Sequence, residues 1–600
     1  MSYNAPLKDM QFVLTELANL AEINALPGCE DATPDTVEAV LEENAKFCRD
    51  VIAPLNHAGD KDPSYWKDGA VTTTKGFREA FKAYADAGWQ GVQHPQDFGG
   101  QGLPKLVATP CMEMLHGANL AFALVALLSD GAIEALLTAG SDAQKARFLE
   151  PLVSGKWTGT MNLTEPQAGS DLAAVRTRAE PQGDGTYKIF GTKIFITYGD
   201  HDMTENIVHL VLARTPDAPP GVKGISLFIV PKFMINDDGT LGARNDVACV
   251  SIEHKLGIKA SPTAVLQFGD NGGAIGTLVG EENRGLEYMF IMMNAARFGV
   301  GMQGVGLAEH AYQGAVAFAK DRIQSRDVAG SSGPVAIIHH PDVRRMLMSM
   351  RSQTEAARAL AYVGAALSDL AHHHPDEATR TTNLAVYEYL VPIIKGWSTE
   401  MSEQVARDGV QVHGGMGFIE ETGAAQHYRD AKILTIYEGT TAIQANDLVG
   451  RKTVRDGGAV AKALIAQIRD VERQLGDVQG AAQGSDFAAI AQRLQEGSAA
   501  LEHVVEYVVA NVKTDVRAVF AGSVTYLKLA GIVLGGWQMA RAALAAQKRL
   551  DAGEGDAAFY RAKIGTARFF ADHILSQAPG LRTSIVDGAA GVLALDVEQF

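Results

Sequence analysis

The chain has 600 residues, of which 46% are hydrophobic and 20% charged, a composition typical of globular protein and not of a disordered chain. Its length suggests about three or four domains. The formal net charge of -17 opposes general binding to nucleic acid, which needs basic surface to neutralise phosphates.

Cysteine usage and the first residues of the chain bear on its compartment. The four cysteines are widely separated and form no C-x-x-C pair: Cys29, Cys48, Cys111 and Cys249. This pattern favours a reducing cytosol and predicts neither a disulfide framework nor a metal site. Residues 1–10 show no basic region followed by an apolar core, so no secretory signal is expected. We therefore expect a cytoplasmic protein.

The longest apolar runs bear on membrane insertion. Leu120–Leu128 and Leu529–Leu534 are too short to cross a bilayer. We therefore expect a soluble protein with no stable membrane insertion.

Composition and periodicity divide the chain into four parts. The predicted helical parts are residues 1–156, 283–450 and 459–600, and the predicted β domain is residues 157–282. A charged linker, Arg451–Gly458, precedes the last helical part. The expected fold class is therefore α+β, and mainly α.

Two helix starts in the first part have typical capping residues. Thr33 followed by Pro34 places an N-cap residue before a proline in the first turn. Ser141 and Gln144 have the spacing of a capping box.

The second part changes to short β-branched segments bounded by Gly, Pro, Asn or Asp. These predicted strands are Ile207–Ala213, Ile225–Pro231, Val247–Ile252 and Ala264–Phe268. Because no helices lie between them, we expect an antiparallel barrel or sandwich. No G-x-G-x-x-G motif follows a strand, so a Rossmann nucleotide site is not expected.

Helices return in the third part. Leu286–Gln324 is predicted to form one long helix, Pro341 begins another, and Pro392 kinks a third or begins a new one. The fourth part is expected to hold four helices, broken around Gly476–Gly484, Lys513–Thr514 and Gly553–Gly555.

One carboxylate, Glu438, follows an apolar, helix-like run, Ile433–Tyr437, and precedes Gly439. If solvated, it is a surface residue at a helix end, with Gly439 as the C-terminal stop. If it faces inward, desolvation raises its pKa toward neutrality and makes it a candidate general base. Taken alone, the segment favours the surface residue, because perturbed acids are rarer than solvated ones.

Six motifs follow one another across residues 30–450. They are F-G-G-Q-G-L-P at 98–104, Q-K-A-R-F-L-E-P-L-V-S-G-K-W at 144–157, T-E-P-Q-A-G-S-D at 164–171, K-I-F-I-T at 193–197, Q-V-H-G-G-M-G-F at 411–418 and R-D-A-K-I-L-T-I-Y-E-G-T at 429–440. In this order they resemble the acyl-CoA dehydrogenase family. The resemblance implies an N-terminal helical domain, a middle antiparallel β domain and a helical bundle, with FAD between the last two.

Two motifs carry the side chains that the resemblance places on the flavin. The hydroxyls of Thr164 and Ser170 and the backbone N–H groups near Gly169 suit flavin edge atoms and a pyrophosphate. Phe195 stands where the family places an aromatic ring, more commonly Trp, and Thr197 stands where a hydroxyl meets the flavin. Without the resemblance, the first motif is an ordinary polar turn and the second a strand with one buried face.

Further segments match family positions that bind FAD. Arg322 and Gln324 match an R-x-[TQ] pair that acts across a dimer interface, although Ser325-Arg326 replaces the usual Phe-Gly after it. The other matching positions are Gln411, Gly414, Gly415 and Thr440. The resemblance therefore implies an FAD-binding homodimer.

The resemblance assigns acyl-CoA contacts to Ser170, Arg297, Glu438 and Gly439. Glu438 occupies the base position, which removes the α-proton while hydride leaves the β-carbon for the flavin; its backbone N–H helps to stabilise the thioester oxygen. Some family members place the base on the long helix, where this chain has Ala296. Without the resemblance, Arg297 is a solvated or ion-paired surface group.

Residues 459–600 lie outside the minimal family core. Enlarged members include very-long-chain enzymes, a DNA-binding alkylation-response subgroup and bacterial enzymes acting on 3-(methylthio)propanoyl-CoA, and the opening M-S-Y-N-A-P-L-K-D-M-Q-F-V-L most resembles the last group. From Lys452 to Phe600 there are 16 basic and 16 acidic residues, and a neutral domain is a poor phosphate partner. We interpret the extension as a helical domain that supports the dimer.

The resemblance implies an FAD-dependent acyl-CoA dehydrogenase. The expected reaction converts 3-(methylthio)propanoyl-CoA to 3-(methylthio)acryloyl-CoA, a step of dimethylsulfoniopropionate degradation, with electrons passed to electron-transferring flavoprotein. Three alternatives stay open: a medium- or long-chain fatty acyl-CoA dehydrogenase of β-oxidation, a DNA-associated flavoprotein and a flavin oxidase. Nucleic acid is not among the expected partners.

Overall fold

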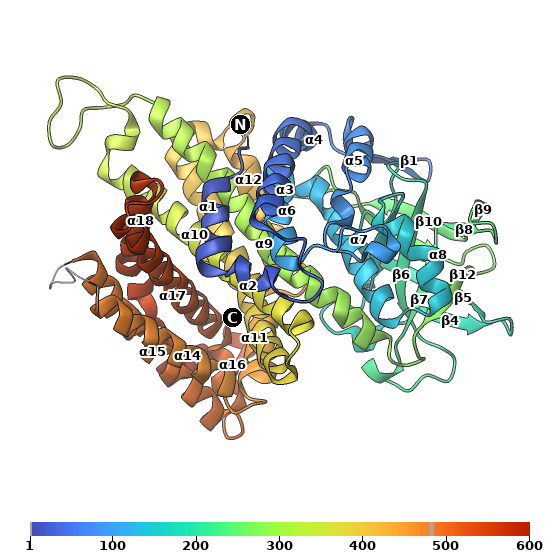
Figure 1. Cartoon of the computed structure of the whole chain (residues 1–600). Coiled ribbons are helices and arrows are strands. Elements are labelled where there is room, and N and C mark those ends of the chain that lie inside the picture. The colour runs from blue at the N-terminus through green and yellow to red at the C-terminus, as the bar shows by residue number, and fades with distance from the viewer. Residues whose placement is uncertain (1–2, 479–484) are drawn as a thin grey trace.

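The computed structural model describes residues 3–478 and 485–600. Helices form most of the molecule, and an eight-stranded sheet lies at one end of it, to the right in Figure 1. The predicted fold class, α+β and mainly α, is confirmed.

Helices precede the sheet along the chain. They are α1 (Leu7–Phe12), α2 (Leu20–Asn24), α3 (Pro34–Phe47), α4 (Pro54–Lys61), α5 (Phe77–Asp86), α6 (Lys105–Ala118), α7 (Leu120–Ala139) and α8 (Asp142–Val153), with a hairpin of β1 (Tyr65–Lys67) and β2 (Ala70–Thr72) after α4. Thr33 caps α3 by accepting a hydrogen bond from the Thr36 amide, and Ser141 and Gln144 form the capping box of α8. Both predicted helix starts are confirmed.

The sheet contains every strand predicted from the sequence. Its strands are β3 (Trp157–Asn162), β4 (Arg178–Pro181), β5 (Thr186–Thr197), β6 (Asn206–Ala213), β7 (Ser226–Pro231), β10 (Val247–Ile252), β11 (Thr263–Phe268) and β12 (Ala274–Val279), and β8 (Phe233–Ile235) with β9 (Leu241–Arg244) forms a separate hairpin. The strand order is β10-β11-β5-β12-β7-β6-β3, with β4 on β5.

One edge of the sheet departs from the predicted antiparallel arrangement. Strand β3 runs parallel to β6, with Trp157 opposite Asn206. A parallel pair needs a long crossover connection, and the chain between β3 and β6, which includes β4 and β5, supplies one.

Three long helices form the centre of the molecule: α9 (Gly285–Asp321), α10 (Pro341–His373) and α11 (Glu377–His413). Helix α9 ends before Gln324, contrary to the prediction, because Arg322 has an extended backbone. Helix α11 continues through the buried Pro392, so the alternative of a new helix start there is wrong. Packing against α9 and α10 holds α11 across this proline.

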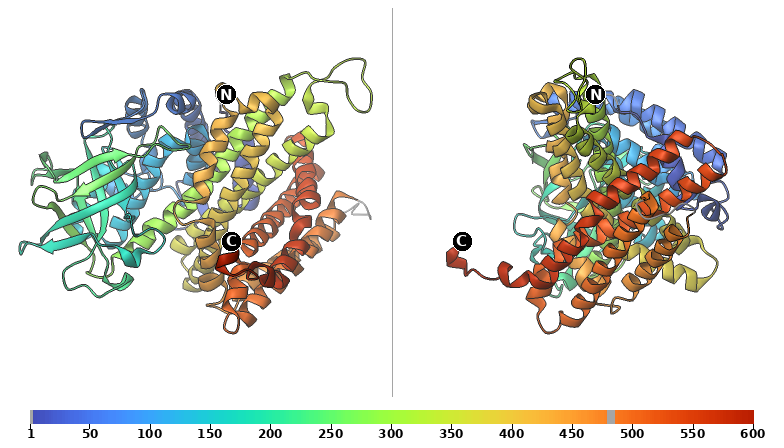
Figure 2. Two further views of the ribbon diagram at one scale, coloured as in Figure 1. Left: turned by 180° about the vertical axis from the view of Figure 1, so that it is seen from behind. Right: turned by 90° about the vertical axis from the view of Figure 1, so that its left-hand side faces the viewer.

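The C-terminal part is a further helical layer. Its helices are α14 (Ala459–Gly476), α15 (Asp486–Asn511), α16 (Val516–Ala521), α17 (Ser523–Asp551), α18 (Ala557–His573), α19 (Ala578–Asp587) and α20 (Ala589–Val592). Residues 459–478 and 485–600 thus hold seven helices, not the predicted four, because Gly522 separates α16 from α17 and short helices follow α18. Figure 2 shows the end of the chain projecting from the body.

The connection into this layer is shorter than the predicted linker. A helical turn, Leu448–Thr453, continues from α13 (Thr441–Asp447), so part of Arg451–Gly458 is helical. The buried Thr453 hydroxyl lies 2.9 Å from the Tyr526 hydroxyl of α17 and ties the turn to the layer. The predicted break at 476–484 lies partly outside the described residues.

A buried charge cluster joins the N-terminal segment, the central helices and the C-terminal layer. Arg358 of α10 pairs with Asp9, Glu113 and Glu309 at 2.7, 2.6 and 2.7 Å. Lys563 of α18 pairs with the same Asp9. The layer is therefore held by ionic as well as apolar contacts.

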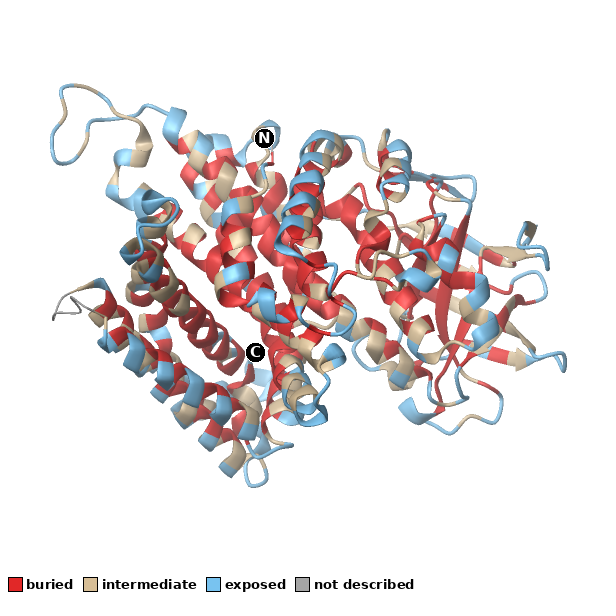
Figure 3. Ribbon diagram, in the orientation of Figure 1, coloured by how far each residue is buried: buried red, intermediate tan, exposed pale blue. Residues whose placement is uncertain are grey.

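Within residues 3–478 and 485–600, two helices have the length and hydropathy of a membrane span, α7 and α17. The sequence analysis predicted that the apolar runs in these helices are too short to cross a bilayer. That prediction is wrong for the helices themselves, which are long enough to do so. In each helix 83% of the apolar window is buried inside the fold, which is the environment of a core helix (Figure 3).

Candidate active site

A buried ion pair holds the T-E-P-Q-A-G-S-D loop against β5. Lys193 Nζ lies 2.8 Å from the Glu165 carboxylate and 3.0 Å from the Leu163 carbonyl oxygen. The same carboxylate accepts hydrogen bonds from the Arg176 and Thr177 amides. Burial alone would raise the pKa of Glu165, but the Lys193 ammonium and these hydrogen bonds lower it to about 2. The carboxylate therefore stays charged at neutral pH.

The tip of this loop is open. Gly169 and Ser170 are exposed, Thr164 is half-buried, and a Cβ added to Gly169 would meet no atom within 4 Å. The Thr164 carbonyl oxygen accepts a hydrogen bond from the Ile194 amide at 3.0 Å, which places the loop beside K-I-F-I-T. Hydroxyl and amide groups at the tip are therefore available to a ligand.

Phe195 lies on an irregular part of β5. Two residues of β5, including Phe195, lie opposite one residue of β11 in a β-bulge. The φ angle of Phe195 is 60°, which few residues other than glycine adopt, and 59% of the residue is exposed. The alternative interpretation of K-I-F-I-T, an ordinary strand with one buried face, is therefore wrong at Phe195. An exposed ring on a strained bulge, with half-buried Thr197 beside it, is a candidate ligand contact.

The segment carrying Glu438 is not the helix expected from its apolar run. Helix α12 (Ala424–Ala431) is followed by a 3-10 turn, Lys432–Thr435, and then by irregular chain up to α13. Glu438 has φ 54° and Gly439 has φ 88°. The base candidate therefore lies in a loop, and its own backbone is in the left-handed region.

The surroundings of Glu438 favour the neutral acid form. The residue is half-buried, and desolvation raises the pKa of its carboxyl, while the charges of Arg297 and Lys395 oppose that rise. Arg297 is 4% exposed and lies 3.5 Å from the Asp447 carboxylate, so it is a buried ion-paired group and not a solvated one. The alternative base position, Ala296, is also buried.

Two buried side chains that the sequence analysis did not single out bind the backbone of this loop. Lys395 of α11 donates to the carbonyl oxygens of Leu434 at 2.8 Å and Gly439 at 2.7 Å. Gln444 of α13 donates to the carbonyl oxygen of Glu438 at 3.1 Å. The only signal for Lys395 in the sequence is a lysine within the apolar run L-V-P-I-I-K-G-W.

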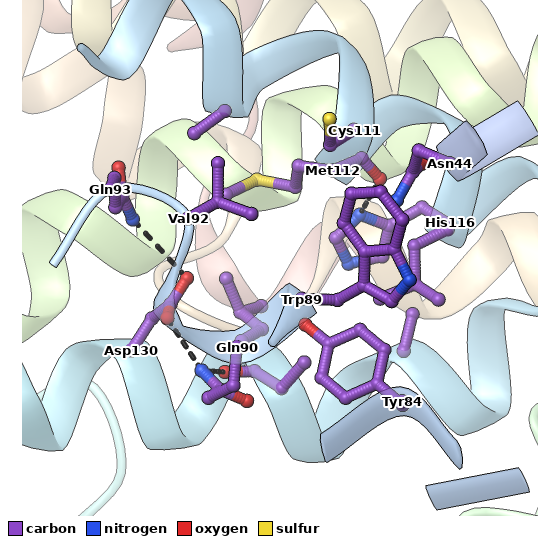
Figure 4. Close-up of a pocket in the computed structure, with 15 residues that line it drawn as sticks. Asn44, Tyr84, Trp89, Gln90, Val92, Gln93, Cys111, Met112, His116 and Asp130 are labelled. Atoms are coloured by element: carbon purple, nitrogen blue, oxygen red, sulfur yellow. Dashed lines mark hydrogen bonds between the residues drawn. The ribbon is translucent and has the colours of Figure 1, made fainter. Parts of the chain in front are cut away.

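A hydrogen-bonded chain leads from the loop into the N-terminal helices. The Tyr437 hydroxyl donates to Gln303 Oε1 at 2.6 Å, and Gln303 Nε2 lies 3.3 Å from His116 Nε2. His116 Nδ1 lies 2.8 Å from the Met112 carbonyl oxygen. Burial lowers the pKa of His116 to about 4, so its neutral ring can accept at one nitrogen and donate at the other. His116 and Trp89 also line a pocket of about 40 Å³ (Figure 4).

Five predicted FAD residues lie together at the far ends of α9 and α11. They are all exposed: Arg322, Gln324, Gln411, Gly414 and Gly415. The rings of Phe318 and His413 lie 4.5 Å apart and place the two segments side by side. Along α9, however, Arg297 and Arg322 are about 38 Å apart at the helical rise of about 1.5 Å per residue. One chain therefore does not bring these five residues to its own Glu438.

Models of known families match nearly the whole chain. The acyl-CoA dehydrogenase N-terminal, middle and C-terminal domains match residues 34–156, 160–271 and 283–452, and a model described as acetyl-CoA dehydrogenase C-terminal like matches residues 464–596. A 3-methylmercaptopropionyl-CoA dehydrogenase of Ruegeria pomeroyi is 51% identical over 594 residues, 99% of each chain. This chain belongs to the acyl-CoA dehydrogenase family.

Other members of the acyl-CoA dehydrogenase family share its full length. A butyryl-CoA dehydrogenase of Syntrophomonas wolfei is 36% identical and covers 97% of this chain and 96% of its own. A solved acyl-CoA dehydrogenase of Bacillus anthracis, complexed with FAD, has the same fold, with a TM-score of 0.74 and 21% identity over 95% and 92% of the two chains. The predicted family, fold and class of enzyme, an oxidoreductase, are confirmed.

Proposed function

We propose that this acyl-CoA dehydrogenase oxidises 3-(methylthio)propanoyl-CoA to 3-(methylthio)acryloyl-CoA and passes the electrons to an electron-transferring flavoprotein. The observation that carries the proposal is Glu438, whose carboxyl has a raised pKa and faces Arg297 and Lys395. The proposed substrate is taken from the 51% identical relative, a 3-methylmercaptopropionyl-CoA dehydrogenase, whose name contains a synonym for the same acyl group.

In this reaction the chain supplies the base and the stabilisation of charge. Glu438 removes the α-proton, and a pKa raised toward neutrality suits a general base. The Glu438 amide donates to the thioester oxygen, where negative charge develops. Ser170, Arg297 and Gly439 complete the proposed substrate contacts. Bound FAD supplies the acceptor for the hydride that leaves the β-carbon.

The residues present fit FAD. The exposed ring of Phe195 offers a π-face, and the open tip at Gly169 and Ser170 offers amide and hydroxyl donors. Thr164 and Thr197 add hydroxyls beside the bulge. Thr440 belongs to the same proposed set, and its hydroxyl also caps α13 by accepting from the Ile443 amide.

A homodimer is part of the proposal, because Arg322 and its neighbours are too far from Glu438 of the same chain. Large apolar side chains exposed around these five residues support a contact with a second copy: Ile323, Val328, Met416, Phe418 and Ile419. Gln324, Gln411, Gly414 and Gly415 would then reach the FAD of the partner chain.

Two further parts of the proposal concern location and domains. A cytoplasmic location is supported by the cysteines, all four of which are free and buried. We propose domain boundaries at residues 1–156, 157–282, 283–450 and 459–600, and the matched family models support a similar division.

The test is anaerobic bleaching of the flavin absorbance by 3-(methylthio)propanoyl-, butanoyl-, octanoyl- and palmitoyl-CoA. We expect the fastest bleaching with 3-(methylthio)propanoyl-CoA. Faster bleaching with butanoyl-CoA would favour the second candidate, a short-chain fatty acyl-CoA dehydrogenase, to which the 36% identical relative points. Bleaching by none of the four would refute the proposed substrate and leave the acyl chain to be sought outside this panel. Rapid peroxide formation in air would instead indicate an oxidase.

A further inference from the structure

A buried lysine of α11 binds the backbone of the loop that carries Glu438. Lys395 has no exposed surface, and its Nζ donates to the carbonyl oxygens of Leu434 and Gly439 at 2.8 and 2.7 Å. These carbonyls lie four residues before and one residue after Glu438. A single ammonium group thus binds the backbone on both sides of the base.

The conformation of this loop needs such a restraint. Left-handed backbone at a residue other than glycine is strained and persists only where the surroundings impose it. Glu438 has this conformation, with φ 54°. Gln444 also binds the loop, but it belongs to α13, which follows the loop directly in the chain. Two other contacts join the ends of the loop to α11, Lys432 with Glu403 and Thr441 with Glu400. Lys395 differs from both because it binds the backbone on each side of Glu438.

The same lysine acts on the charge of the base. Three charged groups act on Lys395: Glu438, Arg297 and Glu400. Desolvation lowers the pKa of Lys395 to about 7, and the Glu438 charge opposes this. While it is charged, Lys395 lowers the pKa of Glu438. Lys395 therefore affects both the position of the base and the pH at which it ionises.

We propose that Lys395 is a positioning residue for the base: it holds the backbone on both sides of Glu438 and so sets the carboxylate against the α-carbon of the acyl chain. This inference rests on the proposed function. A buried lysine with a merely structural role would affect stability or FAD content without a specific effect on the loop.

The main variant is Lys395→Met, which keeps most of the unbranched stem of the side chain and removes its donors and charge. Lys432→Met is the matched control, because Lys432 is exposed at the start of the same loop and binds no loop backbone. Its ion pair with Glu403 of α11, at 3.0 Å, lies at the surface and contributes little to stability. Lys395→Arg keeps the charge and donors. If Lys395→Met gives no soluble protein, Lys395→Gln takes its place.

Amide hydrogen exchange reports on the loop without any substrate. In Lys395→Met we expect exchange of residues 432–441 to accelerate by about tenfold, as the loss of two hydrogen bonds implies. The control and the other helices should exchange as in the wild type. Unchanged exchange in residues 432–441 would overturn the proposal.

Anaerobic flavin reduction gives the second readout. With FAD content retained, we expect reduction of Lys395→Met to be about 100-fold slower, the effect of a misplaced base. As pH decreases, the rate of Lys395→Met should fall at a higher pH than in the wild type, because loss of the ammonium raises the pKa of Glu438. Lys395→Arg should recover part of the rate. A wild-type rate and pH profile would overturn the proposal. If the wild type itself is not reduced, the proposed function fails, and hydrogen exchange still decides whether Lys395 holds the loop.

Discussion

Lys193 and Glu165 form a buried ion pair at 2.8 Å beneath the loop that carries Thr164 and Ser170. We expect Lys193→Met to lower the free energy of unfolding by about 3–5 kcal/mol, because it leaves a buried carboxylate without its partner. The loop should then bind FAD more weakly. Thermal unfolding and the flavin-to-protein ratio measure both effects.

Lys223→Met is the control for this prediction, since Lys223 is exposed in the same sheet domain. A Lys193→Met protein with wild-type stability and flavin content would contradict the predicted role of the ion pair. The pH dependence gives a further check. Because the pKa of Glu165 is lowered from 4.5 to about 2, the stability it contributes is present above pH 4.5 and is lost as pH falls through about 2.

Replacement of the base should separate binding from chemistry. In Glu438→Gln we expect FAD to remain and anaerobic flavin reduction to slow by about 100- to 10,000-fold, the usual contribution of general acid–base catalysis. The matched control is Glu421→Gln, since Glu421 is exposed in the turn before α12. Reduction of Glu438→Gln at the wild-type rate would show that another group removes the proton.

The rate of flavin reduction should depend on pH through Glu438. Its pKa is raised above the ordinary value of 4.5, chiefly by desolvation, and only the carboxylate form can take a proton. The rate should therefore fall as pH decreases, with a midpoint above 4.5. Stopped-flow reduction across this range measures the midpoint. A rate that stays constant down to pH 4.5 would contradict a raised pKa.

The charge cluster predicts how the C-terminal layer is attached. Lys563→Met leaves Asp9 with one fewer cation in a buried site, and we expect a loss of about 3–5 kcal/mol in the free energy of unfolding. Calorimetry of the full chain measures it. Lys528→Met, at an exposed position on α17, should change stability little. Equal unfolding temperatures for the two variants would show that the ion pairs of Lys563 contribute little to the attachment of the layer.

The proposed dimer can be tested at its apolar surface. Phe418 is 86% exposed, and a charge there would be buried in a contact with a second copy. We expect Phe418→Asp to shift the mass in sedimentation from dimer to monomer and to reduce FAD retention. Val597→Asp, at an 85% exposed position on the C-terminal tail, is the matched control. A wild-type monomer would rule out the dimer.

Local signals in the sequence predicted much of this protein. The caps at Thr33 and Ser141, four strands and the order of six motifs depend on neighbouring residues, whose contacts are short in sequence. Such signals say little about how distant segments meet. The parallel pairing of β3 with β6 and the continuous helix at Pro392 both follow from packing between segments far apart in the chain.

The same division applies to Glu438. The sequence by itself predicted that Glu438 occupies the base position and that Ala296 leaves the alternative position without a carboxylate. Only the tertiary structure decided that Glu438 lies in a loop with left-handed backbone and not at a helix end. The reason is that the restraints on this loop come from other helices: Lys395 binds its backbone from 43 residues away, and Arg297 contributes charge from α9.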